Sequence, residues 1–279
     1  MQGNCEGVNS IYKSWIPKIV SIAQQAGHEI TDLYHQKAYQ VKSKLDNSPV
    51  TEADLNAHRI IVTGLQALDP SLPILSEEGE QIPFEVRSQW SRYWLIDPLD
   101  GTEEFIRGTG EFTVNIALIE NHRPVLGVVV APVLQHDYWA ARGAGAYFQN
   151  SASPAQAIQT AAIPHSPLKM AVSRKFHQQI DQHKLAWETL EKNLGEYELI
   201  YCGSALKICL VARGLVDLYP RMGITCEWDT AAGQCILEEA GGQILDLSRE
   251  PLRYNLRASL ENPGFYAISN HYLASRCCG

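Results

Sequence analysis

Apolar residues recur every three or four positions near the start of the chain, which is the spacing of one buried helix face. The pattern covers residues 11–33 and predicts a long first helix. A second helical pattern follows Thr51, runs through Leu65 and ends near Pro70. It places Asp54 in the first turn of the second helix.

Two short apolar runs stop abruptly at acidic residues. Residues 72–75 lead into Glu77 and Glu78, and residues 93–96 lead into Asp97. Short apolar runs bounded in this way are typical of strands. The pattern therefore predicts two strands that carry carboxylates at their C-terminal ends.

The remaining chain is first rich in strands and then alternates strands with helices. Residues 112–119 and 124–130 predict an antiparallel hairpin, and a further strand is expected at 137–141. Residues 149–167 are rich in Ser, Ala and Pro and predict a boundary between an α+β domain (1–152) and an α/β domain (153–279). The second half predicts strands at 170–173, near 199 and at 216–219, and helices at 181–194, 206–212 and 230–240.

Composition narrows the choice of partners. The 279 residues carry a net charge of −8, which opposes binding to nucleic acid. No apolar stretch approaches the roughly 18 to 20 residues of a membrane span, so the cytoplasm is the expected compartment. The seven cysteines include no CxxC pair and the nine histidines no HExxH motif, so no zinc site is predicted. A small anionic substrate requires a local cation, and bound divalent metal is the strongest one.

The candidate chemistry centres on the run from Asp97 to Thr102. Asp97 and Asp100 are separated by two residues, so both carboxylates can leave a strand end on one side of a tight turn. The carbonyl of Leu99 could be a third oxygen ligand, and the N–H groups of Gly101 and Thr102 could face a phosphate. Alone, the run also fits ordinary turn chemistry, since Asp begins turns and Pro presets their second residue.

Two other acidic positions strengthen the metal interpretation. Alone, Glu77-Glu78 fits a solvated loop, and Asp229 fits the N-cap of the helix predicted at 230–240. That helix start would also attract a phosphate. Together, three acidic groups at the ends of elements indicate a centre of two or three metals for phosphoryl hydrolysis.

Four sequence segments carry a family resemblance. The chain resembles the lithium-sensitive, magnesium-dependent phosphatases, a superfamily that includes inositol monophosphatase and fructose-1,6-bisphosphatase. The segments occur in the family's order and cover nearly the whole chain. The resemblance implies the family's layered αβαβα sandwich. The segments are Val50–Asp54, Ser76–Gly79, Trp94–Thr102 and Trp228–Gly233.

Within the superfamily the chain is most similar to the bacterial 3'(2'),5'-bisphosphate nucleotidases. This resemblance implies hydrolysis of adenosine 3',5'-bisphosphate (PAP) to AMP and phosphate in sulfate assimilation, with a metal-activated water as nucleophile. Conversion of 3'-phosphoadenosine 5'-phosphosulfate (PAPS) to adenosine 5'-phosphosulfate, and peripheral attachment to the cytoplasmic face of the inner membrane, are further implications. Two alternatives stay open: an inositol or sugar monophosphatase, and a non-catalytic nucleotide sensor.

The resemblance also implies roles for individual residues. Thr102 and Asp54 match the pair that orients and deprotonates the attacking water, with Glu77 as a further catalytic residue. Two roles are left open for Glu78: it either coordinates a metal directly or supports a neighbouring residue that does. Two or three Mg²⁺ ions are assigned to Glu77, Asp97, Asp100, Asp229 and the Leu99 carbonyl.

Substrate choice is expected to depend on the second half of the chain. Ser204 and Lys207 match a nucleotide-contacting pattern, and Arg221 stands where inositol phosphatases carry a Glu. Alternatively, Lys207 is only the polar side of a helix and Arg221 pairs with an acid such as Glu227. The predicted substrate set is Gly101, Thr102, Ser204, Lys207, Arg221 and Asp229.

One position departs from the nucleotidase pattern. Glu103 stands where many nucleotidases have Lys. A carboxylate there does not help to hold an anion, so no substrate contact is assigned to it.

Overall fold

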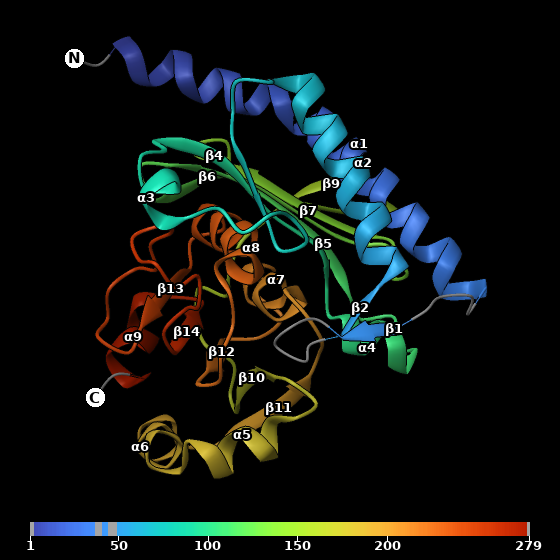
Figure 1. Cartoon of the computed structure of the whole chain (residues 1–279). Coiled ribbons are helices and arrows are strands. Elements are labelled where there is room, and N and C mark those ends of the chain that lie inside the picture. The colour runs from blue at the N-terminus through green and yellow to red at the C-terminus, as the bar shows by residue number, and fades with distance from the viewer. Residues whose placement is uncertain (1–2, 37–40, 44–48, 278–279) are drawn as a thin grey trace.

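Helices and sheets stack in alternating layers (Figure 1). The computed structural model describes residues 3–36, 41–43 and 49–277. In order, the layers are helices α1 and α2, a seven-stranded sheet, helices α7 and α8, a five-stranded sheet, and helices α5, α6 and α9. This order confirms the αβαβα sandwich that the sequence predicts.

The first layer consists of α1 (Gly3–Gln36) and α2 (Glu52–Leu68), which cover one face of the large sheet. Strand β4 (Arg92–Asp100) shows how one strand serves two layers, because successive side chains point to opposite faces. Trp94 belongs to the core under α1 and α2, whereas Leu95 belongs to the core on the other face.

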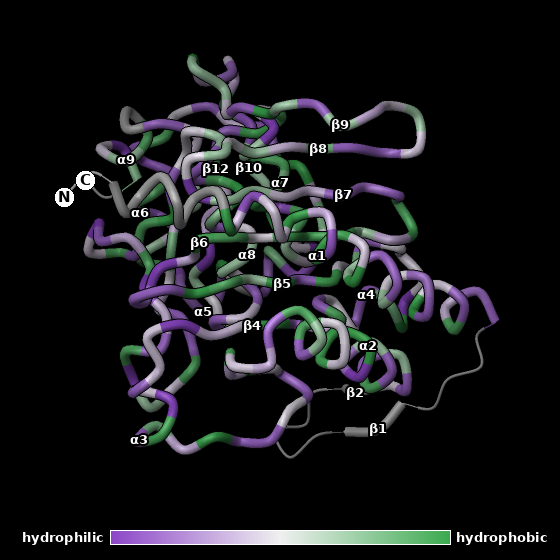
Figure 2. Tube along the Cα trace, turned by 90° about the horizontal axis from the view of Figure 1, so that it is seen from above, coloured by the Kyte–Doolittle hydropathy of each residue, from purple (hydrophilic) through white to green (hydrophobic). Residues whose placement is uncertain are grey.

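The large sheet has the strand order β3-β4-β5-β6-β7-β8-β9. Its strands β3 and β4 are parallel, and all the other neighbours are antiparallel. In Figure 2 the central strands β5 and β6 are largely hydrophobic, whereas β8 is more hydrophilic. The remaining strands of this sheet are β3 (Ile74–Ser76), β5 (Thr113–Glu120), β6 (Arg123–Ala131), β7 (His136–Ala141), β8 (Ala146–Asn150) and β9 (Ser153–Ile158).

The middle layer joins the two sheets. It contains α7 (Leu206–Ala212) and α8 (Glu227–Glu239), whose buried residues share one core with both sheets. Helix α8 lies very close to β6 at Gly127, where an added Cβ would be 2.4 Å from the Ala232 carbonyl oxygen. Only glycine allows this approach, so Gly127 fixes the height of α8 above the sheet.

The second sheet has the order β11-β10-β12-β14-β13, and the outer helices pack on its far face. Strand β10 is parallel to β11 and β12, whereas β14 is antiparallel to β12 and β13. These elements are β10 (Leu168–Val172), β11 (Tyr197–Tyr201), β12 (Leu218–Arg221), β13 (Gln243–Asp246), β14 (Phe265–Ile268), α5 (Phe176–Gln182), α6 (Lys184–Leu194) and α9 (His271–Cys277).

Most predicted elements appear within a few residues of their expected positions, including the hairpin formed by β5 and β6. The helix expected at 181–194 is α6, which begins at Lys184, and the separate helix α5 before it was not expected. The stretch 149–167 contains β9, a mostly exposed edge strand whose sequence alternates too weakly to predict it. The division into domains 1–152 and 153–279 stays a prediction. The strands β8, β13 and β14 and the helix α9 were also not expected. The same holds for four short elements, β1 (Val41–Ser43), β2 (Pro49–Thr51), α3 (Phe84–Arg87) and α4 (Thr102–Arg107).

Among the helices of the described ranges, none combines the length and the apolar composition that a membrane span requires.

We expect Gly127→Val to lower the free energy of unfolding by about 2 kcal/mol or more, since the new side chain would push α8 away from β6. Urea denaturation measures this loss. Ala157→Val, on the exposed strand β9, is the matched control and should change stability by less than about 0.5 kcal/mol. Equal effects of the two variants would contradict the close packing of α8.

Candidate active site

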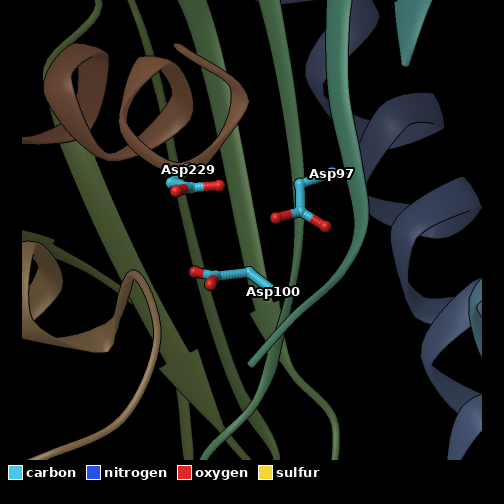
Figure 3. A group of neighbouring side chains, drawn as sticks. All are labelled: Asp97, Asp100 and Asp229. Carbon is cyan, nitrogen blue, oxygen red and sulfur yellow. The ribbon is translucent and has the colours of Figure 1, made fainter. Parts of the chain in front are cut away.

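Three aspartates converge where the large sheet meets the middle layer. Asp97 and Asp100 come from β4, and Asp229 comes from α8 (Figure 3). One carboxylate oxygen of each lies within 4.8 Å of the other two. The structure therefore brings together residues that are more than a hundred positions apart in the sequence.

An irregularity in β4 lets both of its aspartates reach this cluster. In a regular strand, residues three positions apart point to opposite faces. The pairing of β4 with β5 changes register between Asp97 and Asp100, which removes this conflict. The expected tight turn after Asp97 is therefore wrong: the strand continues to Asp100, and the turn begins at Gly101, whose φ is 95°.

The expected N-cap role of Asp229 is also wrong. Helix α8 begins at Glu227 with Cys226 as its N-cap, so Asp229 is the third helical residue. Its Oδ2 accepts a hydrogen bond of 2.8 Å from the Cys226 amide. The carboxylate still lies in the first turn, where the helix dipole favours negative charge. The prediction failed because Cys is a poor N-cap, and the sequence therefore gave no sign that the helix starts earlier.

Burial and mutual repulsion destabilise the charged forms of these carboxylates. Burial and the nearby Glu77 raise the pKa of Asp97 well above its ordinary value. Burial raises the pKa of Asp100 to about 6, against the influence of Lys207. Burial and Asp100 raise the pKa of Asp229 to about 8. A bound cation would relieve this repulsion.

Asp100 also shows how a ligand oxygen is kept available. Its Oδ2 accepts hydrogen bonds from the Ala205 amide (2.6 Å) and the Asn115 side chain (3.3 Å). Its Oδ1 accepts none from the described residues. One oxygen thus orients the side chain, and the other can bind a cation. Such all-oxygen donor sets suit hard divalent ions, so these residues fit a magnesium site.

Glu77 lies beside this cluster because β3 and β4 are parallel and end at the same edge of the sheet. Its amide donates to the Ile96 carbonyl over 3.2 Å, and its charge contributes to the raised pKa of Asp97. Glu78 follows, and its amide donates to the Ser76 hydroxyl over 3.3 Å. Both glutamate side chains are partly buried, so both remain candidates for the metal centre.

Thr102 and Asp54 come from different elements and meet at the same site. Thr102 Oγ1 lies 3.1 Å from Asp54 Oδ1 and 3.3 Å from the Leu99 carbonyl, and it can donate to either. Asp54 Oδ2 accepts hydrogen bonds from the Thr51 amide (2.7 Å) and hydroxyl (2.6 Å). Burial raises the pKa of Asp54, while the Thr51 hydrogen bonds oppose that shift. The geometry orients a hydroxyl beside the metal-binding carboxylates.

A cavity opens next to the aspartates and contains the predicted substrate residues. Among the described residues, Ser204 Oγ and Arg221 Nε have no hydrogen-bond partner, and both are buried there. Buried polar groups are usually satisfied, so these two atoms indicate a missing polar ligand. Arg221 does not pair with Glu227: it donates to the Ile224 carbonyl (2.8 Å), while Glu227 accepts from the Asn255 amide.

Lys207 is placed differently from a simple substrate contact. Its side chain is only 5% exposed, so it is not the polar face of a surface helix. Its Nζ donates to the carbonyls of Ser204 (2.7 Å) and Cys202 (3.3 Å), and it lies 5.2 Å from the centre of the Tyr219 ring. Its charge also lowers the pKa of Asp100. Lys207 thus stabilises the turn at Ser204 and offsets the charge of the partly buried Asp100.

The two halves of the chain meet tightly at this cavity. An added Cβ on Gly203 would lie 2.4 Å from the Glu111 carbonyl oxygen, and one on Gly101 would lie 3.4 Å from Ser204 Cβ. The sequence interpretation missed three lining residues, Ser173, Arg174 and Lys175. A polar and basic run directly after a predicted strand was the available signal for them.

The fold and the carboxylate site together define a class of metal-dependent phosphatases. The model of the inositol monophosphatase family matches residues 12–276, and the chain belongs to this family. A crystal structure of CysQ from Bacteroides thetaiotaomicron, described as a bacterial member of that family, has a TM-score of 0.76 at 38% identity, covering 92% of this chain and 97% of the other. An inositol monophosphatase from Thermotoga maritima has a TM-score of 0.74 at 26% identity, covering 92% and 93%.

Two curated relatives carry a more specific name. The 3'(2'),5'-bisphosphate nucleotidase CysQ of Aggregatibacter actinomycetemcomitans is 44% identical over 88% of this chain and 90% of its own. The protein of the same name from Escherichia coli (strain K12) is 43% identical over 90% of this chain and 98% of its own. The chain therefore resembles this nucleotidase over nearly its full length.

We expect metal to stabilise the protein through the aspartate cluster. Mg²⁺ at about 100 times its Kd should add about 2.7 kcal/mol to the free energy of unfolding. Asp97→Asn should stabilise the metal-free protein by about 1 kcal/mol or more, because it removes a buried charge, yet abolish most of the Mg²⁺ effect. Thermal unfolding with and without Mg²⁺ measures both. A variant that keeps the full Mg²⁺ shift would rule out Asp97 as a ligand.

The same cluster should make the metal-free protein sensitive to pH. Because folding raises the pKa of Asp100 to about 6 and that of Asp229 to about 8, the folded state holds protons that the unfolded state has released. Stability should therefore fall between about pH 4 and pH 8, and the gain from Mg²⁺ should grow over this range. Chemical denaturation at several pH values checks this expectation. A stability that rises with pH over that range would contradict it.

Proposed function

We propose that this protein is a Mg²⁺-dependent 3'(2'),5'-bisphosphate nucleotidase that uses two or three ions. It hydrolyses the 3'-phosphate of adenosine 3',5'-bisphosphate to give AMP and phosphate, and it also converts PAPS to adenosine 5'-phosphosulfate. The supporting observation is the cluster of the buried Asp97 with the partly buried Asp100 and Asp229 beside the Thr102–Asp54 pair, in a chain 44% identical to a nucleotidase of that name. The reaction belongs to sulfate assimilation in the cytoplasm.

Asp97, Asp100 and Asp229 would hold the metals, together with Glu77 and the Leu99 carbonyl. Bound divalent ions supply positive charge for the phosphate oxygens and acidify water. The protein's own contribution is to orient the attacking water and to accept its proton. Asp54 Oδ1 accepts a hydrogen bond from the Thr102 hydroxyl, which leaves the lone pairs of the Thr102 oxygen available to water. As water attacks the phosphate, its proton passes to Thr102 and the Thr102 proton passes to Asp54.

The second half of the chain would select the nucleotide. Ser204 Oγ and Arg221 Nε are unsatisfied donors in the cavity and suit an oxygen-rich ligand. Lys207 acts mainly by fixing the Ser204 turn and by compensating Asp100. The amides of Gly101 and Thr102 complete the phosphate contacts. We assign residues 1–152 to the part with most metal ligands and 153–279 to the part with Asp229 and the selecting residues.

Removing the Thr102 hydroxyl should slow the reaction without removing the metals. Thr102→Val and Asp54→Asn should each lower kcat by roughly 10²- to 10⁴-fold, since both remove the proton path from water. Thermal shifts with Mg²⁺ should stay close to those of the wild type. Thr102→Ser keeps the hydroxyl and should retain most activity. If Thr102→Val is fully active, the pair does not handle the proton.

A substrate panel tests the function itself. With Mg²⁺, the protein should release phosphate from adenosine 3',5'-bisphosphate much faster than from inositol 1-phosphate, and EDTA should abolish both rates. Faster release from inositol 1-phosphate would assign the protein to the inositol or sugar monophosphatases. Tight nucleotide binding without phosphate release would identify a sensor. Full activity after removal of all metal would exclude the metal mechanism.

A further inference from the structure

The cavity beside the aspartates is lined by four basic residues within the described chain, and each one already has a partner. The buried Lys207 donates to two backbone carbonyls. Arg221 donates to the Ile224 carbonyl. Arg174 and Lys175 form ion pairs with acidic residues of the first half of the chain. A ligand phosphate that lies at neither the metals nor the open Arg221 Nε must therefore displace one of these partners to gain a further cation.

Lys175 is the cation that can be displaced most easily. Its Nζ lies 2.6 Å from both carboxylate oxygens of Glu103, and both side chains are 43% exposed. Exposed ion pairs of this kind contribute little to stability. Glu103 also lies 3.3 Å from Arg107, so it keeps a partner when Lys175 leaves.

Arg174 is held more firmly than its neighbour. Its partner Glu111 is 19% exposed on the side chain, and the same Glu111 oxygen also accepts the Gly203 amide at 3.0 Å. If Arg174 moved away, the Glu111 carboxylate would lose the positive charge that offsets it, at the point where Glu111 packs closely against Gly203. Lys175 is thus the better candidate for a cation that changes partner, from the Glu103 carboxylate to a phosphate of the ligand.

We propose that Lys175 binds the second phosphate of the substrate, and that the Glu103 carboxylate occupies the position of that phosphate when no substrate is bound. Glu103 is thus an internal competitor for Lys175. A phosphate carries more charge than a carboxylate and offers three acceptor oxygens, so it can take the ammonium group from Glu103. This arrangement keeps Lys175 paired until a doubly phosphorylated ligand displaces Glu103.

This inference rests on the proposed nucleotidase function, and the two can be tested separately. The substrates are adenosine 3',5'-bisphosphate and adenosine 3'-monophosphate, which differ only in the second phosphate. If the wild-type protein with Mg²⁺ hydrolyses neither, the proposed function fails. If it hydrolyses the bisphosphate, the variants below decide the role of Lys175.

The two partners of the ion pair should have opposite effects. Lys175→Met should lower the ratio of kcat/KM for the bisphosphate to that for the monophosphate by roughly tenfold or more. Lys175→Arg should restore most of the ratio. Glu103→Gln should lower KM for the bisphosphate by roughly two- to fivefold, because Lys175 then has no competing carboxylate. Lys184→Met removes the lysine of the exposed Lys184–Glu188 pair on α6 and is the matched control, with an unchanged ratio.

Two outcomes would overturn the proposal. If Lys175→Met and Glu103→Gln impair the bisphosphate reaction equally, the ion pair only holds the two halves together. If Lys175→Met leaves the substrate ratio unchanged, another group binds the second phosphate. Thermal unfolding of each variant shows whether a loss of activity reflects a loss of folding.

Discussion

The central physical constraint of this protein is the close placement of several carboxylates that are buried or partly buried. Burial raises the pKa of Asp97, Asp100 and Asp229, and the neighbouring carboxylates add to the rise at Asp97 and at Asp229. Such a cluster opposes folding unless a cation compensates it. The same repulsion creates the affinity for divalent metal on which phosphate hydrolysis depends, so the destabilising feature and the functional feature are one.

The layered fold keeps this cluster in place. Strand β4 is buried on both faces, and α8 is packed between two sheets. Neither element can move without disturbing a large apolar core. Gly127 adds a close backbone contact between α8 and β6. The packing of three layers therefore holds the aspartates together against their repulsion, and the metal-binding side chains are in position before a metal binds.

The site has few basic residues, and each of them has a different role. Lys207 fixes a turn and offsets Asp100, and Arg221 offsets Asp229. Lys175 is paired with Glu103 across the two halves of the chain. An acidic protein can thus bind a polyanion without a basic surface, because metals and a few held cations act only inside the cavity.

The sequence by itself determined the fold class, the family and the identity of the acidic residues, because helix and strand periodicity and the run from Asp97 to Thr102 are local signals. It also indicated the Thr102 and Asp54 pair, which the structure places in contact. Only the tertiary structure decided how these groups are used. The register change in β4, the start of α8 at Glu227 and the burial of Lys207 depend on packing between distant segments. The Lys175–Glu103 pair spans 72 positions, and no local pattern encodes such a contact.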